Sequence, residues 1–302
     1  MKCVICAIAK QENNYLYEWA KYHVNIGFEH IYLYDNNDID GEKPQIVFRH
    51  TDLQDKVSII DVRGKKYQQL VAYQHCSDTF TYDWCAFIDI DEFITFSKDS
   101  GFHTITDYLQ SFSTKIQAIH INWLCFNDNG YVRKQKTILQ SYTNSIYPLD
   151  FCYTYDNISE NRHIKSIIRG GIICDWCMKD ENGKATPHTP NNLCCVANVR
   201  GGVIDNTPFA DIILSPVYIR HYITKSLEDY YVKIQRQAAD WDGVVYRIGT
   251  YFRINHISLR KLLYISKKGK IPWKEIGYQW LKYRIINYHL PLRFLIKSLR
   301  MK

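Results

Sequence analysis

The apolar and polar positions of the chain follow two periods, one typical of strands and one typical of helices. Short apolar runs rich in β-branched and aromatic residues predict buried strands, and apolar residues three or four positions apart predict amphipathic helices. The predicted strands are residues 2–9, 30–34, 57–62, 84–88, 118–126, 163–169 and 217–220, and the predicted helices are 12–26, 68–79, 104–112 and 227–241. This alternation predicts an α/β fold with a mixed, mainly parallel sheet flanked by helices.

The composition fits an ordinary globular protein, with 46% apolar and 23% charged residues in a chain of 302. The Gly-rich phosphate-binding motifs of dinucleotide enzymes and P-loop proteins do not occur, nor does an apolar run long enough to span a membrane. The opening MKCVICAIAK lacks the pattern of a secretory signal, so we expect a cytoplasmic protein with reduced, mostly structural thiols. The pairs Cys174/Cys177 and Cys194/Cys195 break the usual zinc-ribbon spacing.

Charge is distributed unevenly between the two ends of the chain. Residues 260–302 hold twelve lysines and arginines and a single acid, so their net charge is +11. Because the whole chain has a net charge of +7, the preceding residues have a net charge of −4. Apolar residues, two of them Trp, are interleaved with these charges. We therefore divide the chain into a domain at 1–257 and a basic amphipathic helical segment at 258–302. The segment either lies on an anionic inner-leaflet surface, which predicts a peripherally membrane-associated protein, or packs on the domain.

Two acidic residues follow the predicted strand at 84–88. Asp89 and Asp91 point to the same side if the strand continues, with Ile90 opposite. Carboxylates beside a buried strand are costly without a compensating partner, and Mg²⁺ or Mn²⁺ prefers such oxygen ligands. The alternative is a solvated acidic turn that holds no metal.

Polar residues also follow two other predicted parallel strands, at Lys10/Glu12 and at Asp35/Asn36. Ligands of open α/β sheets bind outside the carboxyl ends of the strands. We therefore expect these residues and the Asp89/Asp91 pair to lie along one edge of the sheet.

Five stretches, taken in order, resemble glycosyltransferase family 92 and its bacterial family-2-like relatives. They are IAKQENNYLYEWAKYHVNIGFEHIYLYDNND, FIDIDEF, INWLCFNDNG, KSIIRGG and RHYITKSLEDYYVK. The resemblance covers about residues 3–240, and it departs from the family at Asn127, where the relatives usually carry Gly. It implies a GT-A fold and inverting transfer of a sugar, often galactose, from a UDP-sugar to a saccharide acceptor. With the basic tail, a lipid-linked oligosaccharide, capsule or lipopolysaccharide acceptor is expected.

The resemblance and the chemistry together give each candidate residue a role. The metal ligands for Mn²⁺ or Mg²⁺ would be Asp89, Asp91 and His221. The donor would contact Lys10, Glu12, Asp35, Asn36, Asp89, Lys165, Arg169 and Lys225. The acceptor would contact Trp123, Trp176 and His188. The general base that inversion requires would be Asp128, with Asp175 and Glu92 as the next candidates.

Two other classes of protein remain open from the sequence alone. A nucleotidyltransferase or metal phosphohydrolase would use the same carboxylates, and it would turn over without an acceptor. A nucleic-acid-binding protein would explain the basic tail and the 24 Tyr residues. The body of the chain is slightly acidic and has no RNA-binding motif, so we expect no nucleic-acid partner.

Overall fold

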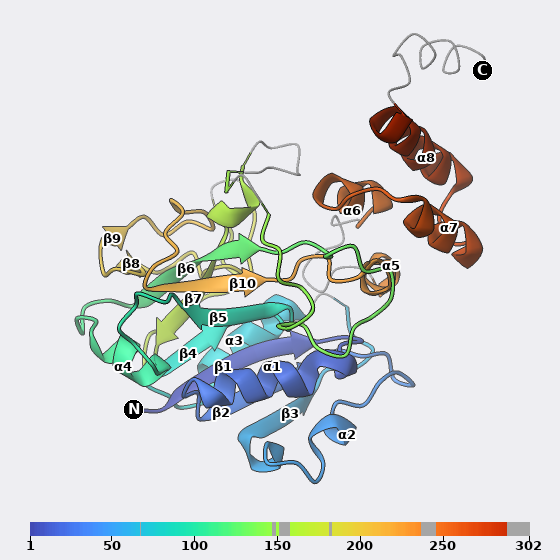
Figure 1. Ribbon diagram of the computed structural model, residues 1–302. Helices are drawn as coiled ribbons and strands as arrows, with labels where there is room; N and C mark the ends of the chain where they lie inside the picture. Colours follow the sequence, from blue (N-terminus) through green and yellow to red (C-terminus); the bar gives the residue numbers. More distant parts are fainter. Residues whose placement is uncertain (67, 147–148, 151–157, 181–182, 237–245, 289–302) are drawn as a thin grey trace.

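The computed structural model describes residues 1–66, 68–146, 149–150, 158–180, 183–236 and 246–288. Figure 1 shows the helices and strands along the chain. The strands are β1 (Cys3–Ala9), β2 (His30–Asp35), β3 (Val57–Asp61), β4 (Trp84–Phe87), β5 (Glu92–Phe96), β6 (Ala118–Cys125), β7 (Ile164–Arg169), β8 (Val196–Asn198), β9 (Val203–Ile204) and β10 (Val217–His221). The helices are α1 (Asn13–Asn25), α2 (Gln45–Phe48), α3 (Gln69–Thr79), α4 (Ile105–Gln110), α5 (Leu227–Arg236), α6 (Ile248–Ile254), α7 (Leu259–Lys268) and α8 (Trp273–Tyr288), with 3₁₀ turns at Gln54–Lys56 and Glu160–Arg162.

The described strands pair into one mixed sheet in the order β3-β2-β1-β4-β7-β6-β10-β5; off this path, β8 pairs with β6, and β9 pairs with β8. Strands β3, β2, β1 and β4 are mutually parallel, and β6 is parallel to β10. Strand β7 lies antiparallel between β4 and β6, and β5 is antiparallel to β10 at the edge. Because two reversals separate β4 from β6, both strands run in the same direction and end at the same edge.

Helices cover both faces of the sheet, as the alternation of β1 shows. Cys3, Ile5 and Ala7 face a core that includes residues of α1 and α4. Val4 and Cys6 face the opposite core, which includes residues of α3. A strand that is apolar on both faces is typical of a parallel sheet buried between two layers of helices. Figure 1 shows α1 and α3 on either side of the sheet.

The C-terminal helices form a third core cluster beside the sheet. Leu227 and Tyr230 of α5 pack with Tyr251 of α6, Leu262 of α7 and Ile276 of α8. Figure 1 shows α6, α7 and α8 grouped at one end of the molecule, next to α5. Within the described residues, no helix combines the length and the apolar character that crossing a bilayer requires.

The predicted strands and helices agree with the structure to within one or two residues at most ends, and the α/β fold class is confirmed. The predicted helix at 227–241 is α5 as far as Arg236, and its last five residues lie outside the described part. The short strands β5, β8 and β9 had no separate prediction. The predicted boundary between residues 257 and 258 stays a prediction, and the shared core of α5 to α8 describes how the two sides pack.

Candidate functional site

The sheet brings the polar strand ends together at one edge. β10 pairs with β5 so that His221 lies opposite Glu92, and the backbone N–H of Tyr222 donates to the carbonyl of Asp91 at 2.8 Å. Strand β4 ends at Phe87, and after the buried Ile88 the chain turns through residues 89–91. The strand register therefore places the late residue His221 beside the early acidic turn.

Asp91 is the buried centre of this cluster, with 6% of its surface exposed. Its Oδ2 lies 3.3 Å from Lys233 Nζ, and its Oδ1 lies 3.8 Å from His221 Nε2. Burial alone would raise the pKa of Asp91, but Lys233, followed by His221, outweighs burial and holds that pKa well below its usual range. Asp91 is therefore a buried carboxylate that stays ionised.

Asp89 is more exposed and is paired with a different lysine. Lys165 Nζ donates to Asp89 Oδ2 at 2.9 Å, and the amide of Gln69 donates to Asp89 Oδ1 at 2.7 Å. The side chain of Lys165 is 1% exposed, and burial alone would lower its pKa. The carboxylates of Asp89 and Glu92 raise the pKa of Lys165 by more, so the lysine keeps its charge.

Glu92 is fully buried at the base of the turn. Its Oε2 accepts the backbone N–H of Asp89 at 2.9 Å and lies 4.0 Å from Lys165 Nζ. Burial raises the pKa of Glu92 well above its ordinary value, and Lys165 opposes this only in part. A residue with no exposed surface that braces the turn is in a poor position to reach an acceptor hydroxyl.

A second ion-pair cluster joins the end of β1 to α5. Lys225 Nζ donates to Glu12 Oε2 at 2.9 Å, and Arg236 Nη1 donates to Glu12 Oε1 at 2.7 Å. Burial alone would raise the pKa of Glu12, and the two cations lower it overall. Lys225 also has a left-handed backbone, with φ of 50°, which is uncommon for a residue with a side chain. Lys10 is more exposed and pairs with Asp38 at 2.9 Å.

Asp35 and Asn36 shape the loop after β2. Asp35 is completely buried and lies 3.2 Å from Arg63 Nε, and its Oδ1 accepts the side-chain amide of Asn37 at 2.7 Å. Asn36 donates through Nδ2 to the carbonyl of Lys65 at 2.8 Å. Both side chains are thus engaged within the loop.

Trp123 lies within a group of three histidines. Its ring centroid is 4.1 Å from that of His221, 4.8 Å from that of His163 and 5.4 Å from that of His188. Burial lowers the pKa of His221 to about 3 and the pKa of His188 well below its ordinary value, so both rings are neutral near pH 7. Trp123 Nε1 and His221 Nδ1 are buried atoms that lack a hydrogen-bond partner within the described structure.

Three of the sequence-predicted residues do not join this edge. Arg169 lies at the opposite end of the sheet, where its guanidinium sits 4.1 Å from the ring centroid of Trp84. The reason is that β7 runs antiparallel to β4 and so ends where β4 begins. Trp176 is buried against Phe87 in the core, at a centroid distance of 4.6 Å, so it offers no face to a sugar.

Asp128 is the third, and it is held by the C-terminal helices. Lys261 of α7 forms an ion pair with Asp128 Oδ2, and the hydroxyl of Tyr251 in α6 donates to the same oxygen. Asp128 is 3% exposed, so these contacts make it a buried structural link between β6 and α7. Asp175 is exposed in the loop after β7, and its Oδ1 accepts the backbone N–H groups of Cys177 and Met178, contacts that do not place it against the charged cluster.

The sequence analysis missed two cations of the site. Lys233 and Arg236 lie on α5 and contact Asp91 and Glu12, which are 142 and 224 residues away in the chain. Lys233 is the last residue of RHYITKSLEDYYVK, the final stretch that resembles the family. Its position in that stretch could have indicated a role in the site.

The geometry of the candidate metal ligands can be compared with what a divalent cation requires. Asp91 Oδ1 and His221 Nε2 lie 3.8 Å apart, and Mg²⁺ holds ligands at about 2.1 Å, so both atoms can bind one ion. Asp89 is paired with Lys165 instead. In the described part of the chain, no group of three His, Cys, Asp or Glu side chains is placed to hold an ion by itself. The pair thus fits a cation that takes its other ligands from water or a substrate phosphate.

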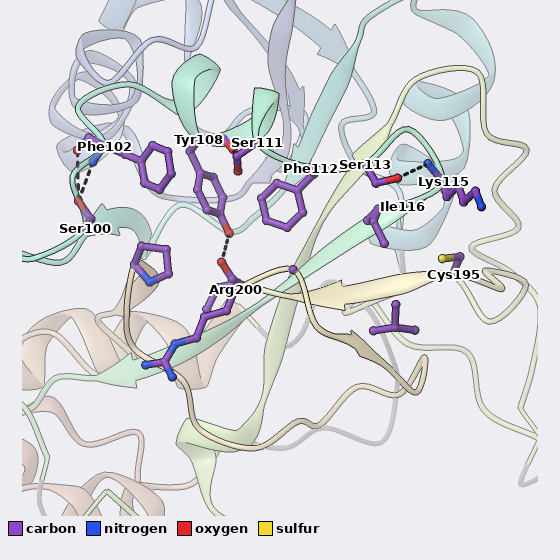
Figure 2. Close-up of a pocket in the computed structure, with 14 residues that line it drawn as sticks. Ser100, Phe102, Tyr108, Ser111, Phe112, Ser113, Lys115, Ile116, Cys195 and Arg200 are labelled. Atoms are coloured by element: carbon purple, nitrogen blue, oxygen red, sulfur yellow. Dashed lines mark hydrogen bonds between the residues drawn. The ribbon is translucent and has the colours of Figure 1, made fainter.

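A cavity of about 590 Å³ lies at the opposite ends of the strands, near the starts of β6 and β10 (Figure 2). Its walls include the rings of Phe102, Tyr108 and Phe112, and Arg200 lies at its lower side in Figure 2. None of its lining residues is a candidate site residue, and none carries a buried polar atom without a partner. This cavity is therefore separate from the charged cluster.

Two comparisons concern sequence. The model of glycosyltransferase family 92 matches residues 2–173, which is more than half of the chain. A glycosyltransferase family 92 protein of Oryza sativa subsp. japonica is 27% identical over 144 residues, which are 46% of this chain and 24% of that protein. One of Ricinus communis is 32% identical over 94 residues, 30% of this chain and 16% of that protein. The chain thus spans less than a quarter of the length of either relative.

Solved structures give distant similarities. HddC from Yersinia pseudotuberculosis is 13% identical with a TM-score of 0.32, covering 73% of this chain and 77% of that chain. Mannosyl-3-phosphoglycerate synthase from Rubrobacter xylanophilus is 8% identical with a TM-score of 0.30, covering 45% and 43%. The apo-form glycosyltransferase GlyE in Streptococcus pneumoniae TIGR4 is 17% identical with a TM-score of 0.27, covering 40% and 29%. At these scores the fold assignment rests on the strand order of this chain. By the match over residues 2–173, the chain belongs to glycosyltransferase family 92.

Proposed function

We propose that the protein transfers a sugar, with inversion, from a UDP-sugar to a saccharide acceptor at the carboxyl edge of the sheet. Galactose is the sugar that the family resemblance favours. The observation that carries the proposal is Asp91, a buried and ionised carboxylate that lies against both His221 and Lys233. Buried ionised groups with strongly shifted pKa values are concentrated at functional sites, which supports a binding role for this carboxylate.

Asp91 and His221 would hold a divalent cation, Mn²⁺ or Mg²⁺. Such an ion neutralises charge on the diphosphate of the departing nucleotide. Asp89 orients Lys165, and Glu92 fixes the turn that carries Asp89. The ammonium groups of Lys165, Lys225 and Lys233 and the guanidinium of Arg236 would pair with phosphate oxygens.

The nucleoside is expected on the side of the cluster nearest β1 and β2. Lys10 lies there, and Glu12 holds its two cations. Asp35 and Asn36 support this side by fixing the loop after β2 rather than by presenting free groups.

Trp123, which is 7% exposed against 1% for Trp176 and whose Nε1 has no partner among the described residues, is a proposed acceptor contact together with His188. His163 joins them because its ring stacks on Trp123. Asp175 is the proposed general base, because of the three carboxylates considered it is the exposed one. It would take the proton from the acceptor hydroxyl as that oxygen attacks the anomeric carbon.

An anionic membrane surface is the proposed partner of the C-terminal helices. One side of α7 and α8 packs inward through Leu262 and Ile276, while Trp273 and Tyr278 are 71% and 61% exposed. Exposed aromatic residues among basic ones are typical of helices that lie on anionic lipid. Residues 289–302 lie outside the described part.

Sedimentation with vesicles tests this proposal. Phosphatidylglycerol vesicles should deplete the protein from the supernatant, whereas phosphatidylcholine vesicles should not, and W273S should weaken the binding.

Thermal unfolding with nucleotides tests the donor site. UDP, GDP, CMP and UDP-sugars are each added with Mn²⁺ or with EDTA. A ligand that binds only the folded state raises the unfolding midpoint. We expect UDP and UDP-galactose to raise it only with Mn²⁺, and D91N to lose the shift. D78N, an exposed change on α3, serves as the matched control. If no nucleotide raises the midpoint with Mn²⁺ present, the donor site is misassigned. Release of free galactose at the same rate without any acceptor would favour a hydrolase.

A further inference from the structure

The acidic turn has its own counter-ions. Asp91 pairs with Lys233 at 3.3 Å and Asp89 pairs with Lys165 at 2.9 Å, so each carboxylate already faces an ammonium group. A divalent cation that arrives alone meets two positive charges next to its ligands. A diphosphate that arrives alone meets two carboxylates next to the lysines. Either ligand by itself therefore encounters like charge in a partly desolvated cluster.

The two lysines are held differently. Lys165 lies on β7 in the interior of the sheet, where Asp89 and Glu92 both face it. Lys233 lies near the end of α5, and its side chain is 15% exposed, against 1% for Lys165. Its ammonium also donates to the carbonyl of Ile223 at 3.2 Å, which gives it an acceptor besides Asp91. A lysine has a flexible stem and three donors, so Lys233 can turn from Asp91 toward another anion that offers it an oxygen in exchange.

We propose that Lys233 is a built-in counter-ion of Asp91, and that a diphosphate, by accepting the ammonium, makes this carboxylate more available to a divalent cation. The inference rests on the proposed function and adds a rule of binding to it. Cation and diphosphate then bind as a coupled pair, and each raises the affinity for the other by the same factor. The exchange keeps every charge paired, because the cation replaces Lys233 at Asp91 while Lys233 moves to a phosphate oxygen.

Isothermal titration of the full chain tests the coupling. Mn²⁺, UDP, and each in the presence of the other are titrated at one pH and one ionic strength, and Mn²⁺ binding is checked by its electron paramagnetic resonance signal. In the native protein we expect UDP to raise the Mn²⁺ affinity by about 10-fold or more, within the usual range of coupling between sites. Activity is not part of the readout.

Variants at position 233 assign the effect. K233M and K233Q should bind Mn²⁺ alone roughly 5-fold more tightly, and the coupling should fall below about 3-fold, because the competing charge is gone. K233R keeps the charge and should keep most of the coupling. K274M removes an exposed charge from α8 and should behave as the native protein. Thermal unfolding of each variant confirms that it is folded.

Each contrary result has a separate meaning. If the native protein binds Mn²⁺ and UDP equally well alone and together, the counter-ion inference fails while the donor site stands. The same holds if folded K233M and K233Q keep the full coupling. If the native protein binds neither ligand, alone or together, the proposed function fails and this inference fails with it.

Discussion

The two ends of β7 show how differently the two edges of the sheet are built. Lys165 and Arg169 are cations four residues apart on one strand. Lys165 meets the carboxylate of Asp89, whereas Arg169 meets neutral groups, the ring of Trp84 and the carbonyl of Ile116 at 2.8 Å. The carboxyl edge thus gathers buried charge, whereas Arg169 at the opposite edge has neutral partners. Strand direction, more than residue type, decides which of two similar cations can serve a charged ligand.

The largest effect is expected from removing the charge at the carboxyl edge. D91N should lower the rate of sugar transfer by about 100-fold or more, since a lost charge contact in the transition state is typically worth several kcal/mol. The measurement is kcat/KM for a UDP-sugar and a saccharide acceptor. A D91N enzyme that stays within a few-fold of the native rate would show that the buried charge at this edge is structural.

Removing a buried ion pair away from that edge should lower stability without changing catalysis. K261M leaves Asp128 buried without its cation, so the free energy of unfolding should fall by about 3 kcal/mol. The rate per folded molecule should stay near the native value. Urea unfolding measures the free energy of unfolding, and the transfer rate divided by the concentration of folded protein measures activity. If D128N instead abolishes transfer in a fully stable protein, Asp128 is the base after all.

A buried histidine between α1 and β5 should give a pH dependence of stability. His23 Nδ1–H donates to the carbonyl of Trp19 at 2.8 Å, and its Nε2 accepts the N–H of Ile94 at 3.2 Å, so the ring must be neutral. Burial lowers its pKa from 6.5 to about 3. Between these values the unfolded chain binds the proton and the folded chain does not, so stability falls as the pH drops below 6.5.

At pH 5 the loss from His23 should be about 2 kcal/mol relative to neutral pH. Unfolding free energies measured from pH 7.5 to 4.5 give the slope, and H23Q should make the slope shallower. An identical slope in both proteins would place the acid sensitivity elsewhere. His221, whose pKa burial lowers to about 3, and His120, whose pKa burial lowers to about 4, are the next candidates.

The smallest effect is expected at the opposite edge. R169M removes two hydrogen bonds to backbone carbonyls and a contact with Trp84, so it should cost about 1 kcal/mol of stability. The Mn²⁺-dependent shift with UDP should be unchanged. A lost UDP shift in a folded R169M protein would contradict the contrast between the two edges.

The sequence predicted what depends on local pattern. The apolar run of β4 and the helical spacing of α1 marked both elements, and the strand ends placed Lys10/Glu12, Asp35/Asn36 and Asp89/Asp91 on one edge. The resemblance supported the family and the role expected for His221. Lys165 was expected to contact phosphate, and the structure adds that it pairs with Asp89.

Contacts between distant residues account for the rest. Nothing near Asp128 in the chain indicates that Lys261 will neutralise it, because the two meet only when α7 docks. Arg169 was assigned to the donor because its spacing from Lys165 puts both on one face, and the antiparallel direction of β7 was not part of that pattern. Trp176 follows a turn of ordinary loop composition, and only the packing on Phe87 makes it a core residue.

The antiparallel position of β7 also constrains how the chain is assembled as it is synthesised. Strands β1 to β4 are complete by Phe87 and can pair as they emerge. The other edge of β4 stays unpaired until Ile167 and Ile168 of β7 have been synthesised. During that interval a strand of unpaired backbone groups is open to other chains. A ribosome-bound chain that stalls before residue 160 is therefore expected to aggregate, and one that has released residue 221 is expected to be protected, because β10 then completes the central strands.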